Sequence, residues 1–348
     1  LLASSAASDV YKRQFMDSKG LITPEEWRHF CSEVVPLFCT EKFCWTNDEV
    51  LTGDVKIANY SECDLMGKQL SWALLNDKQD VLDKGTLFLQ IKQGELANVG
   101  TLKPAIVSVK KAEKVTLTLS IDGTSYRNDY PLWIYPAGIK AESSSDICVT
   151  DDLEAHLEYL AEGGKVLWFP PKDRYKAQTV GGLFQTDYWN YRMFKTICES
   201  LERPVSPGTL GILTHPEHPA LADFPTEFHT NWQWFPIVKQ SYPMILDSLP
   251  DGYLPIVQVI DNVERNHKLG LLFEFKVGKG RLLVCMSDLR AVQEKPEARQ
   301  FYHSILKYMK SSAFSPSYSI SVADLQDLFT IKVTAGEMQE LFNISSYK

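Results

Sequence analysis

The chain has 348 residues, of which 44% are hydrophobic and 23% are charged, a composition typical of a folded globular protein. It excludes disordered, collagen-like and coiled-coil chains, and at roughly 100–200 residues per domain the length predicts two or three domains. Because the formal net charge is -8 and no apolar run approaches the ~18 residues of a membrane span, we expect neither a nucleic-acid partner nor a membrane partner.

The first 14 residues, LLASSAASDVYKRQ, show no hydrophobic period that continues into the following sequence. A signal peptide would place basic residues ahead of an apolar stretch, and here the order is reversed. The string resembles translated sequencing-adapter read-through at the ends of reading frames from metagenomic assemblies. We therefore expect residues 1–14 to be a non-native artefact and leave them out of the fold.

Residues 15–36 carry one clear helix signal. Thr23 is a candidate N-cap, Pro24 stands at the first helical position, and two glutamates follow in the first turn. We expect the helix to continue through Cys31 and to stop at Pro36, with nothing in this segment for it to pack against. Such a helix is typical of the end of a domain that lies upstream.

The segment 40–137 has the period of two that is typical of β-strands. The clearest run is 115–121, where Val, Leu, Leu and Ile alternate with Thr and Ser, and it ends at the hairpin dipeptide Asp122-Gly123. Turn signals recur about every ten residues, with no helical stretch between them. About seven short strands in this length predict an immunoglobulin-like β-sandwich.

In residues 138–310 helices alternate with short apolar strands, which predicts a flavodoxin-like, three-layer α/β domain. We expect residues 311–348 to form a linker and a C-terminal tail, with a short helix at 322–329. The expected strands are 147–149, 165–169, 209–213, 256–260, 269–275 and 281–286, and the expected helices are 153–160, 188–201 and 297–309.

Common catalytic and cofactor motifs are missing from the α/β segment. Neither GxSxG nor GxCxG occurs, and Cys285 at a strand end lacks the flanking glycines of a nucleophile elbow. GxGxxG and the Walker pattern are absent too. His215 and His218 each precede a proline, which predicts a loop rather than a metal-binding helix face. We therefore predict no cofactor, no metal site and no catalytic residue in this chain.

The seven cysteines do not indicate a disulfide framework, because their number is odd and no CxxC pair occurs. Cys39 and Cys44 flank a strand, and spacing alone leaves their pairing open. Free thiols are the simpler interpretation.

Hydrolysis of a glycosidic bond needs two carboxyl groups in one cleft. The glutamates of the α/β segment stand in helix or rim contexts, where a solvated charge is the default, and no pair is marked. They are Glu199, Glu202, Glu217, Glu227 and Glu274. An independent hydrolase in this segment would instead need an exposed nucleophile beside a histidine.

The most unusual stretch is FHTNWQWF at residues 228–235. Trp232 and Trp234 alternate with polar residues that include His229 and Asn231, a mixture suited to stacking on a sugar ring while hydrogen-bonding its hydroxyls. Packing of the aromatic residues against the sandwich or a further domain is the simpler interpretation, and both stay open here.

A second aromatic stretch, FQTDYWNY at residues 184–191, begins a predicted helix. Asp187 is a candidate helix cap, and Trp189 is suited to helix packing or to carbohydrate contact. Both join the candidate carbohydrate-binding residues of the 228–235 stretch.

In their order along the chain, these segments resemble the C-terminal part of a glycoside hydrolase of family 2, of the large bacterial β-galactosidase type. The α/β segment is similar to a glutamine-amidotransferase-like domain of the trehalose-utilisation kind. The first resemblance depends on Asp17–Gly20 with Thr23–Glu26, Thr46–Glu49, Ala58–Tyr60 and Leu132–Pro136, and the second on His218-Pro219, FHTNWQW and Gly278–Arg281.

The resemblance covers nearly all of residues 15–330 and implies that 15–36 is the end of a catalytic (β/α)8 barrel. In this family the two catalytic glutamates lie in the barrel, so none is carried over to this chain, and the fragment alone is expected to be inactive. The amidotransferase-like segment lacks the cysteine elbow of its relatives, which implies an accessory role.

The implied parent hydrolyses O-glycosidic bonds in carbohydrate catabolism, such as those of a β-galactoside. Its partners would be carbohydrate and the upstream barrel, with the formation of oligomers left open. For a bacterial glycosidase the resemblance implies a periplasmic or extracellular location, and the sequence itself leaves the compartment open.

Overall fold

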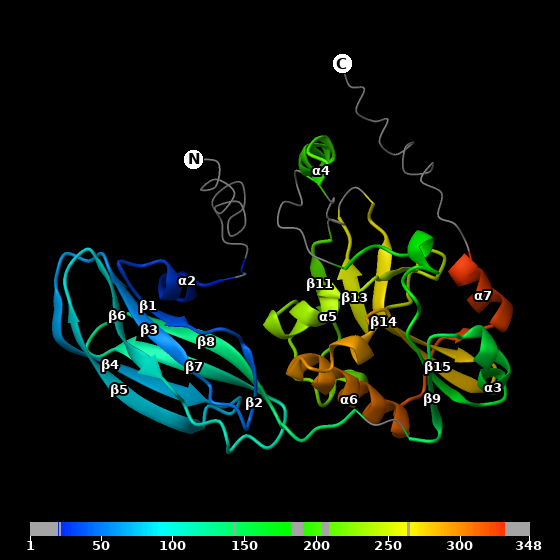
Figure 1. The fold of residues 1–348 in the computed structure, drawn as a ribbon, viewed down its shortest axis with the longest axis horizontal. Coiled ribbons are helices and arrows are strands. Elements are labelled where there is room, and N and C mark those ends of the chain that lie inside the picture. The colour runs from blue at the N-terminus through cyan, green and yellow to red at the C-terminus, as the bar shows by residue number, and fades with distance from the viewer. Residues whose placement is uncertain are drawn as a thin grey trace. The chain divides into compact units, whose positions relative to one another are not determined.

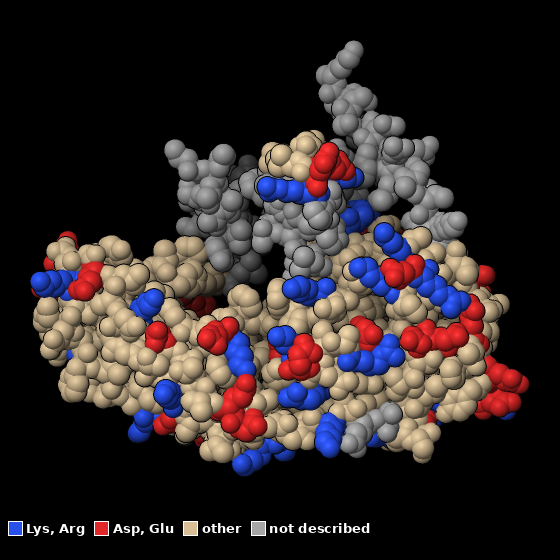
Figure 2. Space-filling model, in the orientation of Figure 1, with Lys and Arg blue, Asp and Glu red and all other residues tan. Residues whose placement is uncertain are grey.

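A computed structural model describes residues 20, 22–141, 144–182, 191–203, 209–262 and 265–330. For residues 191, 192 and 194 it describes the backbone only. The chain divides into two compact units between Ala137 and Gly138. None of the described helices has the length and the apolar character needed to cross a membrane. On the face drawn in Figure 2, positive and negative side chains are interspersed and form no extended patch of one sign.

The first unit is a two-sheet β-sandwich preceded by helix α2 (Pro24–Phe30) (Figure 1). One sheet has the strand order β1-β3-β6, and the other has the order β2-β8-β7-β4-β5. The strands are β1 (Val34–Cys39), β2 (Cys44–Thr46), β3 (Gly53–Asn59), β4 (Leu65–Leu75), β5 (Val81–Ile91), β6 (Glu95–Leu102), β7 (Glu113–Ile121) and β8 (Arg127–Tyr135).

Strand β7 shows why the alternating pattern identifies the core. Successive side chains point to opposite faces of a sheet, so every second residue enters the space between the two sheets. Val115, Leu117 and Leu119 are fully buried there, whereas the residues between them are half-buried on the outer face. The predicted β-sandwich is therefore confirmed.

Helix α2 begins as expected from its sequence. Thr23 Oγ1 accepts a hydrogen bond from the Glu26 backbone N–H at 3.1 Å, and Glu26 Oε2 accepts one from the Thr23 N–H at 2.8 Å, a capping box. None of the helix residues is buried. His29 Nδ1 lies 3.8 Å from Asp129 Oδ2 of β8, so the helix does have a contact within the first unit.

The expected stop at Pro36 is wrong. Pro36 lies inside β1, which pairs with β3 and therefore begins the sandwich ahead of residue 40. β1 is the edge strand of its sheet, where a proline is tolerated because one side of the strand needs no N–H donor. The Pro36 carbonyl accepts hydrogen bonds from Asn128 Nδ2 at 3.0 Å and Tyr130 Oη at 2.9 Å.

The second unit has a mixed sheet with the strand order β11-β13-β14-β15-β10-β9. Its strands are β9 (Ile147–Thr150), β10 (Lys165–Trp168), β11 (Gly211–Thr214), β12 (Met244–Ile245), β13 (Val257–Ile260), β14 (Lys268–Val277), β15 (Gly280–Cys285) and β16 (Ser319–Ile320). Its helices are α3 (Leu157–Ala161), α4 (Tyr191–Ser200), α5 (Phe235–Lys239), α6 (Pro296–Lys310) and α7 (Val322–Thr330), with short 3₁₀ turns η1 (Glu154–His156), η2 (Lys176–Gln178), η4 (Pro219–Leu221), η5 (Trp232–Trp234) and η6 (Leu289–Val292).

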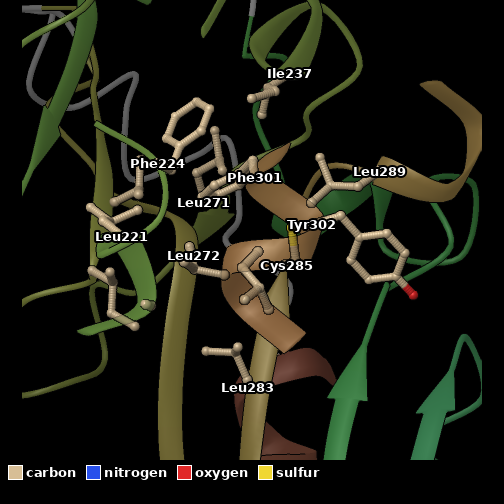
Figure 3. Close-up of a cluster of buried hydrophobic side chains, with 14 of the residues drawn as sticks. Leu221, Phe224, Ile237, Leu271, Leu272, Leu283, Cys285, Leu289, Phe301 and Tyr302 are labelled. Carbon is tan, nitrogen blue, oxygen red and sulfur yellow. The ribbon is translucent and has the colours of Figure 1, made fainter. Parts of the chain in front are cut away.

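Two apolar clusters cover the two faces of this sheet and give three layers. In β10, Leu167 belongs to the cluster that also holds α5 and α6, whereas Val166 and Trp168 belong to the cluster that holds α3 and α7. Figure 3 shows the first cluster, in which Phe224 and Phe301 lie close together. The α/β layering is thus observed.

A flavodoxin-like sheet would be parallel throughout, whereas this sheet is mixed. The pairs β9–β10 and β10–β15 are parallel, but β13–β14 and β14–β15 are antiparallel. A tight turn at residues 278–279 joins β14 and β15 as a hairpin. Gly278 in this turn has a φ of +59°, which favours glycine. The two strands of this hairpin agree with the strands expected at 269–275 and 281–286.

The short helix expected at 322–329 is present as α7, but residues 311–330 pack onto the second unit instead of forming a linker. Strand β16 pairs with β14, and α7 buries Leu325, Leu328 and Phe329. The ring of Phe329 lies 4.5 Å from that of Trp168. The apolar face of α7 therefore completes the second cluster, and residues 331–348 lie outside the described chain.

All seven cysteines are free thiols, so Cys39 and Cys44 form no disulfide. Cys285 is buried at the end of β15, and burial raises the pKa of its thiol to about 12. A thiol with so high a pKa is inert at neutral pH.

Candidate functional site

The stretch 226–235 runs back along the edge strand β11 of the second unit. The Thr214 N–H donates to the Phe228 carbonyl at 2.9 Å, and the Ile212 N–H donates to Thr230 Oγ1 at 2.9 Å. Leu213 and His229 form an isolated antiparallel bridge. These bonds cover the free edge of β11 and fix the backbone of the stretch.

Trp234 is fully buried in the core of its own unit. Its ring lies 5.1 Å from both Phe224 and Phe301, and its Nε1 donates to Thr226 Oγ1 at 2.9 Å. The prediction of Trp234 as a carbohydrate-binding residue is therefore wrong, because no face of the ring is open to a ligand.

Trp232, two residues earlier, is 57% exposed. Phe228 and Phe235 are also exposed, at 64% and 54%, and so are His229 and Leu213. We call these five side chains the aromatic surface. Of the two tryptophans in the stretch, only Trp232 presents its ring to solvent.

Asn231 orders the turn between the exposed and the buried residues. Its Oδ1 accepts a hydrogen bond from the Gln233 N–H at 3.2 Å, and its Nδ2 donates to Glu227 Oε2. Gln233 is fully buried, and its Nε2 donates to the Pro225 carbonyl at 2.7 Å. Asn231 is half-buried and committed to these bonds, so its part is to hold Trp232 in place.

The remaining candidates, Asp187 and Trp189, lie outside the described residues. Of the glutamates considered from sequence, Glu199, Glu202 and Glu217 are exposed, as expected of solvated charges, and Glu227 pairs with Asn231. Within the described residues, no group of three or more His, Cys, Asp or Glu is arranged to hold a metal ion.

A second site lies at a notch in the sheet beside β14. β13 pairs with β14 as far as Leu272, and β16 pairs with it from Lys276. Between these points Tyr253 Oη donates to the Glu274 carbonyl at 3.0 Å in place of a strand. The notch opens into a cavity of about 400 Å³ lined by His215, His218, Tyr253, Leu254, Glu274 and Tyr318, among others.

Glu274 is half-buried at this cavity, and the expectation of a solvated charge is wrong for it. The Tyr308 hydroxyl, from buried α6, donates to Glu274 Oε2 at 2.7 Å. Burial raises the pKa of the Glu274 carboxyl, although the bond from Tyr308 opposes that shift. The signal in the sequence is its position between Phe273 and Phe275, in a run from Leu269 to Phe275 that holds no other charged residue.

His218 stands on the wall of the same cavity. Its Nδ1 accepts a hydrogen bond from the Ala220 N–H at 3.2 Å, which assigns the proton of the neutral ring to Nε2. Its ring lies 5.3 Å from that of Tyr308. Burial, with a smaller effect from His215, lowers the pKa of His218 to about 4, so this histidine is neutral at pH 7.

Solved structures resemble parts of the chain at low sequence identity. A domain of a putative cell surface protein from Methanosarcina acetivorans is 18% identical, covers 30% of this chain and 93% of its own, and has a TM-score of 0.21. A putative β-galactosidase from Bacteroides fragilis is 14% identical, covers 49% of this chain and 27% of its own, and has a TM-score of 0.21.

The structural neighbours also include a β-glucuronidase from Parabacteroides merdae. It is 12% identical, covers 40% of this chain and 22% of its own, and has a TM-score of 0.21. The chain thus spans about a quarter of the length of these two enzymes. None of the curated proteins matches the chain in sequence.

Two family models match the chain, one in each unit. A model described as a domain of unknown function, DUF8488, matches residues 49–136 of the sandwich. A second, described as a domain of unknown function, DUF8487, matches residues 148–330, more than half of the chain. The chain therefore belongs to the family defined by the domain of unknown function DUF8487.

Proposed function

We propose that this chain is a non-catalytic part of a carbohydrate-active protein, and that its α/β unit contacts carbohydrate through the aromatic surface. One observation carries the proposal: Trp232 is 57% exposed on a turn whose next two residues, Gln233 and Trp234, are fully buried. Exposing a large aromatic ring leaves its favourable burial unrealised. A ligand that covers the ring recovers this free energy.

The turn is rigid enough to act as a binding platform. The Trp234 N–H donates to the Asn231 carbonyl at 3.2 Å, and the Trp234 ring is fixed between Phe224 and Phe301. Trp232 is therefore attached to the core through its neighbour. A preorganised ring loses little conformational entropy on binding, which favours affinity.

The chemistry of the surface suits a sugar. Aromatic side chains with polar groups beside them bind ligands that have both an apolar face and hydrogen-bonding edges. The exposed His229 ring lies 4.8 Å from that of Phe228, and it can donate to or accept from a hydroxyl. Carbohydrate combines an apolar C–H face with such hydroxyls.

The parent protein in this proposal is a glycoside hydrolase of family 2 whose catalytic glutamates lie in a barrel outside this chain. The order of the sequence motifs over residues 15–330 supports it. In the same proposal, the sandwich is immunoglobulin-like and the α/β unit is an amidotransferase-like accessory domain that has lost catalysis. The purified chain should then turn over no aryl β-glycoside, and measurable turnover would refute this part.

The test of the aromatic surface is binding of β-linked galacto- and gluco-oligosaccharides by calorimetry. We expect Trp232→Ala to weaken binding by about tenfold or more, since stacked aromatic pairs contribute on the order of 1 kcal/mol beyond the area they bury. Phe88→Ala is the matched control, because Phe88 is a 78% exposed ring on β5 of the other unit. Equal affinity of both variants would contradict the proposal.

A protein partner is the second candidate for the same surface. Leu213 is 41% exposed beside His229 and has no polar group for a sugar. Contiguous exposed apolar side chains are typical of contacts with another domain. Two results together would favour this alternative. The chain would bind no oligosaccharide, and the unmodified chain would bind the proposed barrel domain more tightly than the Trp232→Ala variant does.

A further inference from the structure

The cavity beside Glu274 is built from residues that the aromatic surface does not use. We propose that this cavity binds a small organic molecule through a primary ammonium group, which the carboxylate of Glu274 holds. The proposal goes beyond the proposed function and is independent of it, because no residue of the aromatic surface lines the cavity.

Glu274 places a half-buried carboxyl group at the cavity. The Glu274 side chain accepts a hydrogen bond from the neutral Tyr308 hydroxyl. Within the described residues, no lysine, arginine or histidine forms an ion pair with Glu274. Lys268 donates instead to the carbonyls of Leu249 and Pro250, at 3.4 and 2.8 Å. A carboxylate withdrawn from water without a counter-ion is unfavourable, and a bound cation would supply that counter-ion.

Aromatic side chains form part of the cavity wall. The Tyr253 ring stacks on Phe275 with a centroid distance of 5.3 Å, and the Tyr318 ring meets Tyr253 edge-on at 5.1 Å. Both tyrosines line the cavity. The faces of aromatic rings attract ammonium groups, so the wall and the carboxylate favour the same kind of ligand.

His218 is a half-buried histidine on the same wall. Burial lowers its pKa to about 4, so at neutral pH it brings no positive charge that would repel a cation. A volume of about 400 Å³ lies within the range of small-molecule sites. The cavity thus combines room for a ligand, one carboxyl group and aromatic walls.

The experiment compares benzylamine with benzyl alcohol, two probes of the same size that differ in ammonium against hydroxyl. Binding is followed by NMR of the histidine ring protons, because His215 and His218 line the cavity whereas His229 belongs to the aromatic surface. We expect benzylamine to shift the His215 and His218 signals but not that of His229. It should bind about tenfold or more tightly than benzyl alcohol.

Glu274→Gln is the matched variant, because it keeps the size of the side chain and the acceptor for Tyr308 while removing the charge. It should abolish the preference for benzylamine. Equal binding of the two probes, no shift of either cavity histidine, or an undiminished preference in Glu274→Gln would overturn the proposal. Should Glu274→Gln fail to fold, Leu254→Trp narrows the cavity at a 58% exposed lining residue. Loss of binding there is expected, and unchanged binding would overturn the proposal.

Discussion

The aromatic surface and the cavity beside Glu274 lie in the same unit but are assembled in opposite ways. The aromatic surface comes mainly from one continuous stretch, 228–235, fixed along the edge of β11. The cavity is lined from segments around His215, Tyr253, Glu274 and Tyr318, which are far apart in the sequence. The amino-acid composition of one stretch can therefore reveal a site such as the aromatic surface. A site such as the cavity forms only when the fold brings distant segments together.

The two tryptophans of the stretch sharpen this comparison most strongly. Trp234→Ala should lower the free energy of unfolding by about 3–5 kcal/mol, since it leaves a cavity between Phe224 and Phe301. Urea denaturation measures this change. A loss below about 1 kcal/mol would show that Trp234 is not the anchor of the turn.

Tyr308→Phe tests the support of the Glu274 carboxylate. The variant removes a buried donor to an ionised acceptor, so we expect a loss of about 1.5–3 kcal/mol at neutral pH. The loss should shrink at acid pH, where the carboxyl is protonated in both the folded and the unfolded chain. Denaturation at both pH values measures it, and a loss that does not depend on pH would argue against an ionised Glu274.

His218 predicts how stability depends on pH on the same wall. Its pKa falls from 6.5 to about 4 on folding, so the unfolded chain binds more protons between these values. The contribution of His218 to stability is therefore complete above pH 6.5 and is lost as the pH falls to 4. Because the ring is only partly buried, we expect a loss of roughly 1–2 kcal/mol.

The matched variant for this prediction is His218→Asn, whose Oδ1 can still accept the Ala220 N–H bond. The titratable side chains near it stay in place in this variant. They are His215, Tyr253, Glu274 and Tyr318, which line the same cavity, and Tyr308, whose ring lies 5.3 Å from that of His218. The variant should lose less stability than the unmodified chain over this range. Parallel curves for the two proteins would assign the pH dependence to another group.

Trp232→Ala should have the smallest effect on stability. An exposed side chain contributes little to the core, so the free energy of unfolding should change by no more than about 0.5 kcal/mol. Thermal unfolding beside Trp234→Ala measures the contrast. A change as large as that of Trp234→Ala would mean that both rings pack in the core and that the surface is not free for a ligand.

The sequence predicts best the helices and strands that are determined by residues close together in the chain. The alternating run at 115–121, the strands at 269–275 and 281–286 and the helix at 297–309 all agree with the structure, because each depends on residues close in sequence. Strand β1 and strand β16 were not predicted. Both form by pairing with strands elsewhere in the chain, which a local period does not record.

The candidate site was predictable only in part. The composition of residues 228–235 identified the stretch, but Trp232 and Trp234 have similar sequence contexts. Phe224 and Phe301, which lie outside the stretch, bury the Trp234 ring, whereas the Trp232 ring stays exposed. For the same reason, Glu274 resembled a solvated charge until Tyr308 and the notch in the sheet placed it at a cavity.

The most direct measurement of the central claim is an NMR titration with β-linked galactobiose that monitors the indole N–H signals. The Trp232 signal is assigned by its loss in Trp232→Ala, and the Trp234 signal belongs to the indole that donates to Thr226. We expect the Trp232 signal to shift, with saturation, while the Trp234 signal stays in place. No shift of Trp232 at any sugar concentration, or equal shifts of both signals, would contradict carbohydrate binding at the aromatic surface.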